Sequence, residues 1–238
     1  MKITTMMLCG TMLAAAPLAA VAQNGYPDDR GDDQGAYLEL QIGRSHLYSH
    51  AFDLPGGRFT TESNNGDVAL LSSGYEFSQW SLGSLRVEGE LGYRNNGVDD
   101  QFFNPVGSST GRVRLAEPYG HTEVWSLMLN VINDFAPGSG FDPYIGVGVG
   151  YDRIDFHHYG AAVAGPGTPG VTVLDDVDSG VAYQGMVGFR SQLTQQLALD
   201  VNWRYFKADS PTFTTTAGQS VNSAYTAQAI MVGLAFTF

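Results

Sequence analysis

The sequence has almost no cysteine and few basic residues. Its single cysteine, Cys9, lies within the first 22 residues, so the rest of the chain offers no disulfide, no thiolate metal site and no cysteine nucleophile. Lys and Arg number 12 against 24 Asp and Glu, which gives a formal net charge of −12. Because basic surfaces bind phosphate backbones, this balance argues against a nucleic-acid partner. Beyond the N-terminal segment, no run approaches the roughly 18 apolar residues of a membrane-spanning helix.

The N-terminal segment has the features of an export signal. Lys2 gives a positive start, residues 6–19 (MMLCGTMLAAAPLA) form a short apolar run, and AVA at 20–22 supplies the small residues that signal peptidase cuts after. The run is too short to span a bilayer and is followed by polar sequence. We therefore expect residues 1–22 to be a cleaved signal peptide and residues 23–35 to be a periplasmic tail.

The remaining chain has the composition and the periodicity of β-structure. Glycine is abundant, at 30 residues, and aromatic residues make up 12% of the sequence. Eight segments alternate bulky apolar residues with polar or small ones, and each is near the roughly 9–11 residues that a tilted membrane strand needs. These segments are YLELQIG (37–43), VALLSSGYEF (68–77), LRVEGELGYR (85–94), VWSLMLNVIND (124–134), YIGVGVGYD (144–152), VAYQGMVGFR (181–190), LALDVNWRYF (197–206) and AIMVGLAFTF (229–238).

The connections between these segments alternate between long and short. The short ones span 78–83, 136–141 and 191–196, and the long ones span 45–66, 95–121, 155–179 and 208–222. Outer-membrane barrels have short periplasmic turns and longer extracellular loops, and an even strand number puts both termini on the periplasmic side. We predict an all-β fold: an eight-stranded antiparallel up-and-down transmembrane β-barrel over residues 36–238.

Alternation alone does not decide which face is buried, since a soluble lipocalin-type barrel or a solvated sheet also alternates. Three features favour apolar side chains outward. The polar phase carries opposite charges that can pair inside a barrel. Glycines such as Gly146 and Gly148 share that phase and leave room for long side chains, and aromatics cluster near strand ends, as at membrane interfaces. We therefore expect a narrow lumen with a polar network of Glu39, Arg86, Glu88, Glu90, Arg190, Asp200 and Arg204.

The chain ends in an apolar zigzag with an aromatic as its last residue. A final strand must close the barrel against the first, so that no backbone edge is unpaired in lipid, and its outward residues must be apolar. This ending resembles the signal by which outer-membrane barrels are recognised for assembly. In this sequence the signal consists of Ile230, Val232, Leu234, Phe236 and Phe238.

Most of the mature chain resembles one protein family, the opacity-protein-like surface antigens. The blocks that carry the resemblance are SSGYEF, LRVEGELGYR, LMLNVINDF, DPYIGVGVGYD, AYQGMVGFR and WRYF. Members of this family are eight-stranded outer-membrane barrels related in form to the transmembrane domain of outer membrane protein A, and the resemblance covers about residues 36–238. It implies variable outer loops and a grouping with small porin-like proteins, and it brings no shared catalytic residues.

Histidines are the obvious candidates for chemistry, and all fall in or beside the predicted long loops: His46, His50, His121, His157 and His158. Together with Asp155 they could hold a metal, but neither a helical i, i+4 pair nor a Cys/His spacing is present. The segment SHLYSH (45–50) places serine near histidine, as lipid A-modifying barrels require, yet it lies in a loop and lacks their histidine–serine block. We expect solvated histidines, no metal, no cofactor and no catalytic residues.

The sequence thus predicts a non-enzymatic surface antigen of the outer membrane. The expected partners are outer-membrane lipid and lipopolysaccharide, the barrel assembly machinery during biogenesis, and an unidentified ligand of the extracellular loops. Those loops would present five aromatics to the outside: Phe52, Phe59, Phe102, Phe103 and Phe213. A small porin-like channel and an adhesin are the alternatives, and a lipid A-modifying enzyme is a third.

Overall fold

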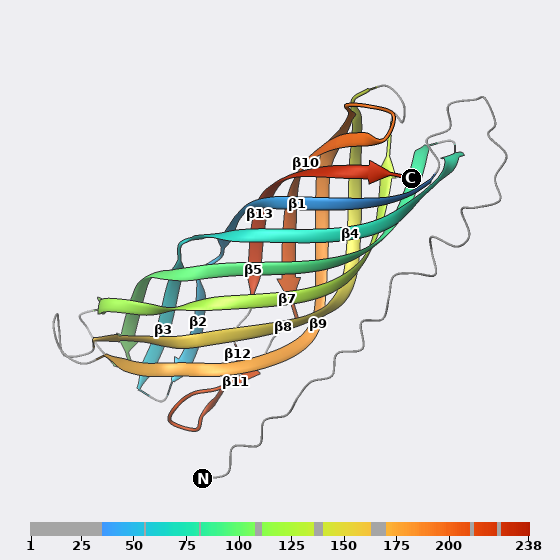
Figure 1. Ribbon diagram of the computed structural model, residues 1–238. Helices are drawn as coiled ribbons and strands as arrows, with labels where there is room; N and C mark the ends of the chain where they lie inside the picture. The colour runs from blue at the N-terminus through green and yellow to red at the C-terminus, as the bar shows by residue number, and fades with distance from the viewer. Residues whose placement is uncertain are drawn as a thin grey trace, which may run out of the picture.

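A computed structural model describes residues 35–54, 56–80, 82–107, 111–135, 140–162, 170–209, 212–222 and 225–238 (Figure 1). The predicted signal peptide (1–22) and nearly all of the predicted tail (23–35) lie outside these residues, as do the side chains of His50 and Phe52. Every element described is a β-strand. Among the residues described, no helix is long and apolar enough to cross a membrane.

Eight strands form a closed antiparallel ring. They are β1 (Gly35–Leu47), β4 (Asn65–Trp80), β5 (Gly83–Pro105), β7 (Ala116–Asp134), β8 (Asp142–Ala162), β9 (Val171–Gln192), β10 (Leu197–Ala208) and β13 (Thr226–Thr237). Each pairs with the next ring strand in the chain, and β13 also pairs with β1, which closes the ring. The predicted eight-stranded up-and-down barrel is therefore confirmed.

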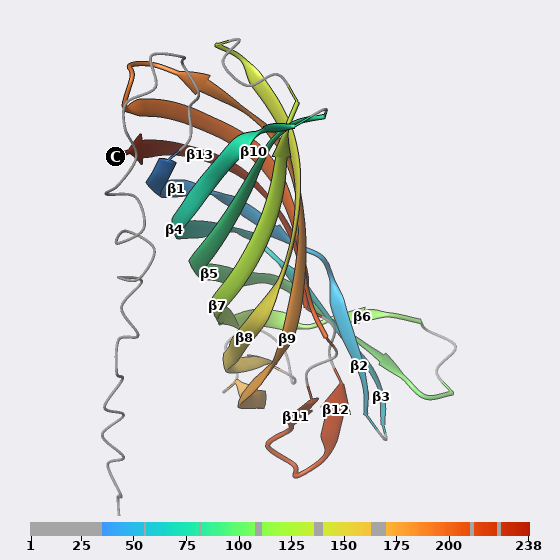
Figure 2. The ribbon, with the colours of Figure 1, turned by 90° about the vertical axis from the view of Figure 1, so that its right-hand side faces the viewer.

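The two ends of the barrel differ, as the predicted topology requires. The start of β1, the C-terminus and the short turns lie at one end (Figure 1). In the first of these turns Gly83 has a φ of 125°, a conformation that residues with a Cβ rarely adopt. The opposite end carries the short strands β2 (His50–Leu54), β3 (Gly57–Ser63), β6 (Val113–Arg114), β11 (Thr212–Thr214) and β12 (Ser220–Asn222) (Figure 2). We refer to these as the periplasmic end and the outer end.

The long connections at the outer end are mostly strand, so the prediction that they are loops was wrong. The strands β5, β7, β8 and β9 extend far beyond membrane length. The pairing of β8 with β7 and β9 continues to Ala162 and Ala161, whereas the pairing of β5 with β7 ends at Gly97 and His121. The connection from β1 to β4 holds the hairpin β2–β3, and β3 adds to the extended part of β5. The connection from β10 to β13 holds the hairpin β11–β12. Hydrogen bonding between neighbouring strands does not require surrounding lipid, so the strands stay paired beyond the membrane.

The membrane-facing wall carries apolar side chains outward, which confirms the predicted orientation. Leu127, Val147 and Ile230 are 65%, 64% and 65% exposed, whereas Arg86 and Glu90, at inward positions, are 1% and 0% exposed. Ring contacts between aromatics lie near the periplasmic end of this wall, in Tyr75–Phe77, Phe141–Phe189 and Phe236–Phe238. Toward the outer end lies a second set, the outer aromatic girdle: Tyr93, Trp125, Tyr151, Trp203 and Tyr205.

Candidate functional site

The periplasmic half of the lumen contains ion pairs centred on Arg86. Its guanidinium donates to Asp134 through Nε (2.6 Å to Oδ2) and Nη2 (2.9 Å to Oδ1), and through Nη1 to Glu88 Oε1 (3.1 Å). The rings of Tyr37 and Tyr144 flank it, with centroids 5.9 and 4.9 Å from Cζ. Bidentate pairing fixes the plane of a guanidinium as well as its position. Arg86 is therefore held rigidly in the centre of the barrel.

Two further arginines extend this arrangement. Arg190 Nη2 lies 2.7 Å from Glu39 Oε2, and its Nε lies 3.6 Å from Asp200 Oδ2. Arg204 pairs with Glu90 nearer the middle of the barrel. Together with Arg86, Glu88 and Asp134, these residues form what we call the ion-pair network, and the seven residues predicted for the lumen all lie in it. Because a desolvated ion without a partner is costly, we expect the loss of one member of the network to destabilise the barrel.

Several members of the polar interior were not among the seven residues predicted for the network. Asp134, Tyr37 and Tyr144 join the network directly, and Tyr144 donates a hydrogen bond of 2.7 Å to Asp200. Gln184 donates to Glu90 Oε1 at 3.1 Å. Other inward polar groups are Gln41, Arg94, Asn130 and Asn202. Each of these residues lies on the inward side of its strand, so the alternation alone could have identified it. The prediction named only seven charged residues and left these out.

Toward the outer end the lumen changes from polar to apolar. The apolar plug, as we call this cluster, includes Leu47, Phe59, Val124, Ile154, Phe156, Tyr159, Leu174, Phe206, Phe213, Val221 and Tyr225. Phe156 packs edge-on against Phe213 and Tyr159, with ring centroids 4.6 and 4.9 Å apart. Burial raises the pKa of Tyr159, and it raises the pKa of Tyr225 to about 12.

The prediction that Phe59 and Phe213 face the outside was wrong. Their exposed fractions are 2% and 0%, because the outer hairpins turn one face toward the barrel mouth. The hairpin β11–β12 is fixed there by carboxylates of β9. Asp178 Oδ2 accepts from Thr212 N–H at 2.7 Å, and Asp176 Oδ2 accepts from Thr214 N–H at 2.6 Å.

Where the two layers meet, the described residues enclose only a small void. A void at their boundary, lined by residues that include Arg94, Arg204 and Phe206, measures about 10 Å³. That volume is near the lower limit for a single water molecule. Nearer the periplasmic end, Gly188 leaves space for the Tyr144 ring, because a Cβ at position 188 would lie only 2.8 Å from Tyr144 Cζ. The small residues of the inward phase thus leave room for neighbouring side chains.

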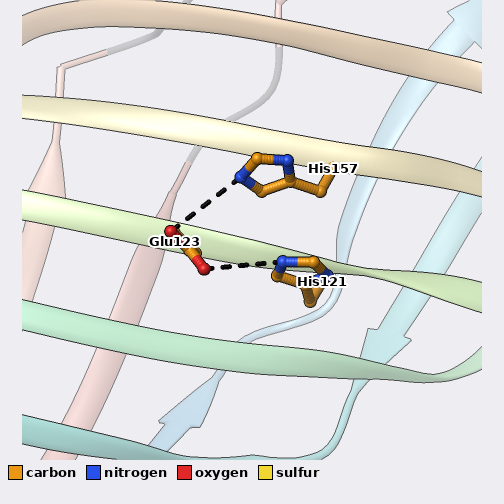
Figure 3. A group of neighbouring side chains, drawn as sticks. All are labelled: His121, Glu123 and His157. Carbon is orange, nitrogen blue, oxygen red and sulfur yellow. Dashed lines mark ion pairs between the residues drawn. The ribbon is translucent and has the colours of Figure 1, made fainter.

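Two histidines meet on the outside of the barrel, where all four histidines with described side chains lie: His46, His121, His157 and His158. His46 Nδ1 is 3.1 Å from Asn65 Oδ1 at an exposed position, while Ser45 beside it is buried, so this serine and histidine point to opposite faces of β1. His121 and His157 lie face to face on neighbouring strands, with ring centroids 4.6 Å apart (Figure 3).

The residues of the predicted C-terminal signal share the outer face of β13. Their exposed fractions range from 42% to 78%: Ile230, Val232, Leu234, Phe236 and Phe238. The strand itself is paired on both sides, with β1 and β10. The last strand therefore closes the ring and turns its apolar side to lipid.

Comparison with known proteins agrees with this architecture. The family model described as "Outer membrane protein beta-barrel domain" matches residues 6–238. A protein named "Outer membrane protein" from Gluconacetobacter diazotrophicus is 24% identical over 250 residues, covering 94% of this chain and 60% of the relative. The chain thus spans 60% of the length of the curated relative that it matches.

Solved structures share the fold at low sequence identity. The outer membrane protein OprG from Pseudomonas aeruginosa has a TM-score of 0.51 at 15% identity, covering 86% of this chain and 97% of that one. The outer membrane protease OmpT from Escherichia coli has a TM-score of 0.53 at 8% identity, with the same coverage of 86% and 97%. The match of the family model, taken with the closed ring and its apolar outer wall, shows that the chain belongs to the outer membrane protein beta-barrel domain family and is an integral protein of the outer membrane.

Proposed function

We propose that this barrel is a non-enzymatic structural and surface protein with a closed lumen. The observation that carries the proposal is the filling of the lumen by two layers, the ion-pair network and the apolar plug, with a void of only about 10 Å³ where they meet. An eight-stranded barrel is just wide enough for side chains to fill its interior. This supports a barrel that stiffens the envelope and presents a fixed surface, and it disfavours the porin-like alternative.

Conductance in planar bilayers tests the closed lumen. We expect no steady conductance above that of the lipid alone from protein whose folding is verified by heat-modifiable migration on a gel. An open porin inserted into the same membranes serves as the positive control. A large, always-open conductance from the folded protein would contradict the proposal.

The non-enzymatic part needs its own test, because OmpT is a protease with a similar fold. The support for it is that the interior arginines and carboxylates of the ion-pair network pair with one another, and that Ser45 and His46 point to opposite faces. We expect a peptide panel and the mass spectrum of lipid A to be unchanged by the folded protein. Cleavage or a mass change that is lost in Glu90→Gln would overturn this expectation.

The partners that we propose follow from the outer wall. Its exposed apolar residues suit lipid and the acyl chains of lipopolysaccharide, and the outward residues of β13 suit recognition by the barrel assembly machinery. Neither partnership needs the lumen, so both can be tested without altering the ion-pair network.

A binding module is the second candidate function, and one feature favours it. The strands β2, β3 and β6 form a sheet with the outer part of β5, and this sheet projects from the ring (Figure 2). Two exposed arginines lie on or beside it: Arg112, whose Cζ is 3.4 Å from the Phe102 ring centroid, and Arg114, which pairs with Asp100. Replacing residues 50–63 by a short glycine–serine linker should reduce adhesion of cells that display the protein. Unchanged adhesion, with the folded barrel present, would remove this candidate.

A further inference from the structure

Four side chains with metal-binding groups lie together on the outer wall, just beyond the outer aromatic girdle. His121 and Glu123 come from β7, and Asp155 and His157 come from β8. The register places His121 opposite His157 and Glu123 opposite Asp155. All four share the outward phase of Trp125, so they lie on the outside of the barrel. We call them the rim cluster.

A β-bulge in β8 directly follows the rim cluster. The pairing of β8 with β9 shifts between Phe156 and Tyr159, and His158 between them has a φ of 49°. A bulge adds one residue to a strand and re-aims the neighbouring side chains. Phe156 and Tyr159 are consequently both buried in the apolar plug, while His157 and His158 are both left outside. The bulge therefore leaves a second imidazole, that of His158, outside beside the rim cluster, and it returns Tyr159 to the apolar plug.

The donor atoms of His121, Glu123 and His157 are close enough to share one ion (Figure 3). His121 Nε2 lies 3.5 Å from Glu123 Oε1, and His157 Nε2 lies 3.9 Å from Glu123 Oε2. His157 Nε2 also lies 3.3 Å from Asp155 Oδ1. One donor atom from each of His121, Glu123 and His157 lies within 4.8 Å of the other two. Ligands bound tetrahedrally to zinc at about 2.0–2.1 Å are about 3.3–3.4 Å apart, so small side-chain rotations would complete the site.

The charges of the rim cluster also favour a cation. Glu123 and Asp155 are directly opposite each other on neighbouring strands, and like charges in that position repel. Within the described part of the chain, the ion-pair partners of both carboxylates are the histidines of the cluster. The side chains of Glu123 and Asp155 are only 31% and 25% exposed, so water screens them incompletely. A bound divalent ion would neutralise both.

From this geometry we propose that the rim cluster binds one Zn²⁺ ion, with His121, Glu123 and His157 as ligands and Asp155 as the fourth. Two imidazoles with carboxylates suit zinc, whereas Mg²⁺ and Ca²⁺ prefer oxygen ligands alone. Four protein donors would give a closed, structural site. The ion would join β7 to β8 where the two strands leave the membrane. This differs from the sequence-based expectation, which considered a metal site formed by the histidines with Asp155 and favoured solvated loop histidines.

The test is zinc titration of the mature full-length barrel, refolded in detergent and stripped of metal. Isothermal titration calorimetry with ZnCl₂ should give one ion per chain, and millimolar MgCl₂ should not displace it. His121→Ala and His157→Ala should each weaken zinc binding by more than about tenfold. Even substitution of a residue that only hydrogen-bonds to a metal ligand often lowers metal affinity by about 10–100-fold. His46→Ala is the matched control, because His46 is a surface histidine on β1, and it should bind zinc as the parent does.

Each outcome of this experiment bears on the proposal. Heat-modifiable migration of every variant separates loss of the ion from loss of the fold. One-to-one zinc binding that persists in the double variant His121→Ala/His157→Ala would overturn the proposal, as would failure of the folded parent to bind zinc, or equal weakening by His46→Ala. The result does not depend on whether the lumen conducts, so it is distinguishable from failure of the proposed function.

Discussion

Replacing Arg86 with methionine should be among the most destabilising single changes in the barrel. Arg86 is 1% exposed, and its guanidinium makes two bonds to Asp134 and one to Glu88. Methionine fills much of the same space but leaves two buried carboxylates without that partner. Removing one member of a buried ion pair typically costs about 3–5 kcal/mol, because the remaining charge is desolvated and unpaired. We expect a loss of about that size in the free energy of unfolding.

The assay is urea unfolding of the barrel in lipid vesicles, followed by tryptophan fluorescence and by gel migration. A double-mutant cycle with Asp134→Asn isolates the pair. The double variant Arg86→Met/Asp134→Asn should be more stable than the sum of the single losses predicts, with a coupling energy of about 0.5–3 kcal/mol. Arg86→Lys keeps the charge but not the bidentate geometry, so it should lie between the parent and Arg86→Met.

Two results would refute this reasoning. One is a loss below about 1 kcal/mol for Arg86→Met, the range of an exposed ion pair. The other is strict additivity of the Arg86 and Asp134 substitutions. Either result would mean that water enters the lumen freely and solvates these charges, and the closed lumen proposed above would then fail as well.

Three further predictions address the lumen, the plug and the last strand. Gly148→Ala should cost about 1–3 kcal/mol in urea unfolding, because the added methyl would overlap Asn130 inside the barrel. Its control is Gly89→Ala, where an added Cβ would meet nothing within 4 Å, and equal losses in the two variants would contradict the close fit. Phe156→Ala should cost about 3–5 kcal/mol in the same assay, because the ring is 1% exposed within the apolar plug. A loss no larger than that of Val113→Ala, at a position 46% exposed, would show that the plug contributes little. Phe238→Ala should lower the amount of folded barrel in outer-membrane fractions, measured by gel migration, relative to Val106→Ala at the outer end, and equal yields would contradict a role of Phe238 in assembly.

The membrane-spanning half was predictable because lipid outside and a packed interior give each phase of a strand one polarity. On β5, Leu91 is 46% exposed and its neighbour Glu90 is 0% exposed, as the alternation of LRVEGELGYR predicts. Alternation likewise places Tyr37, Tyr144 and Asp134 at inward positions of their own strands. What alternation could not give was which inward residues meet across the lumen, because that depends on the register and closure of the whole ring.

The outer half was not predictable in the same way. Its strands still alternate, but there the apolar residues face inward and the polar residues face outward. On β8, Ile154 and Phe156 face inward, whereas Asp155 and His157 face outward to water. A pattern that requires apolar residues on the outward face therefore ends near Tyr151. For this reason the part of β8 beyond that residue was predicted to be a loop. For the same reason the sequence did not reveal that His121 and His157 are cross-strand neighbours.

The length of the paired strands determines what the outside of the cell encounters. β8 has 21 residues, which at about 3.3 Å per residue extend roughly 70 Å, whereas a membrane strand needs only about 9–11 residues. About half of this strand thus stands beyond the hydrocarbon as part of a collar of hydrogen-bonded backbone. Antibodies raised against the folded protein should therefore recognise residues joined by pairing, such as Glu123 with Asp155, and should bind poorly to denatured chains or to linear peptides.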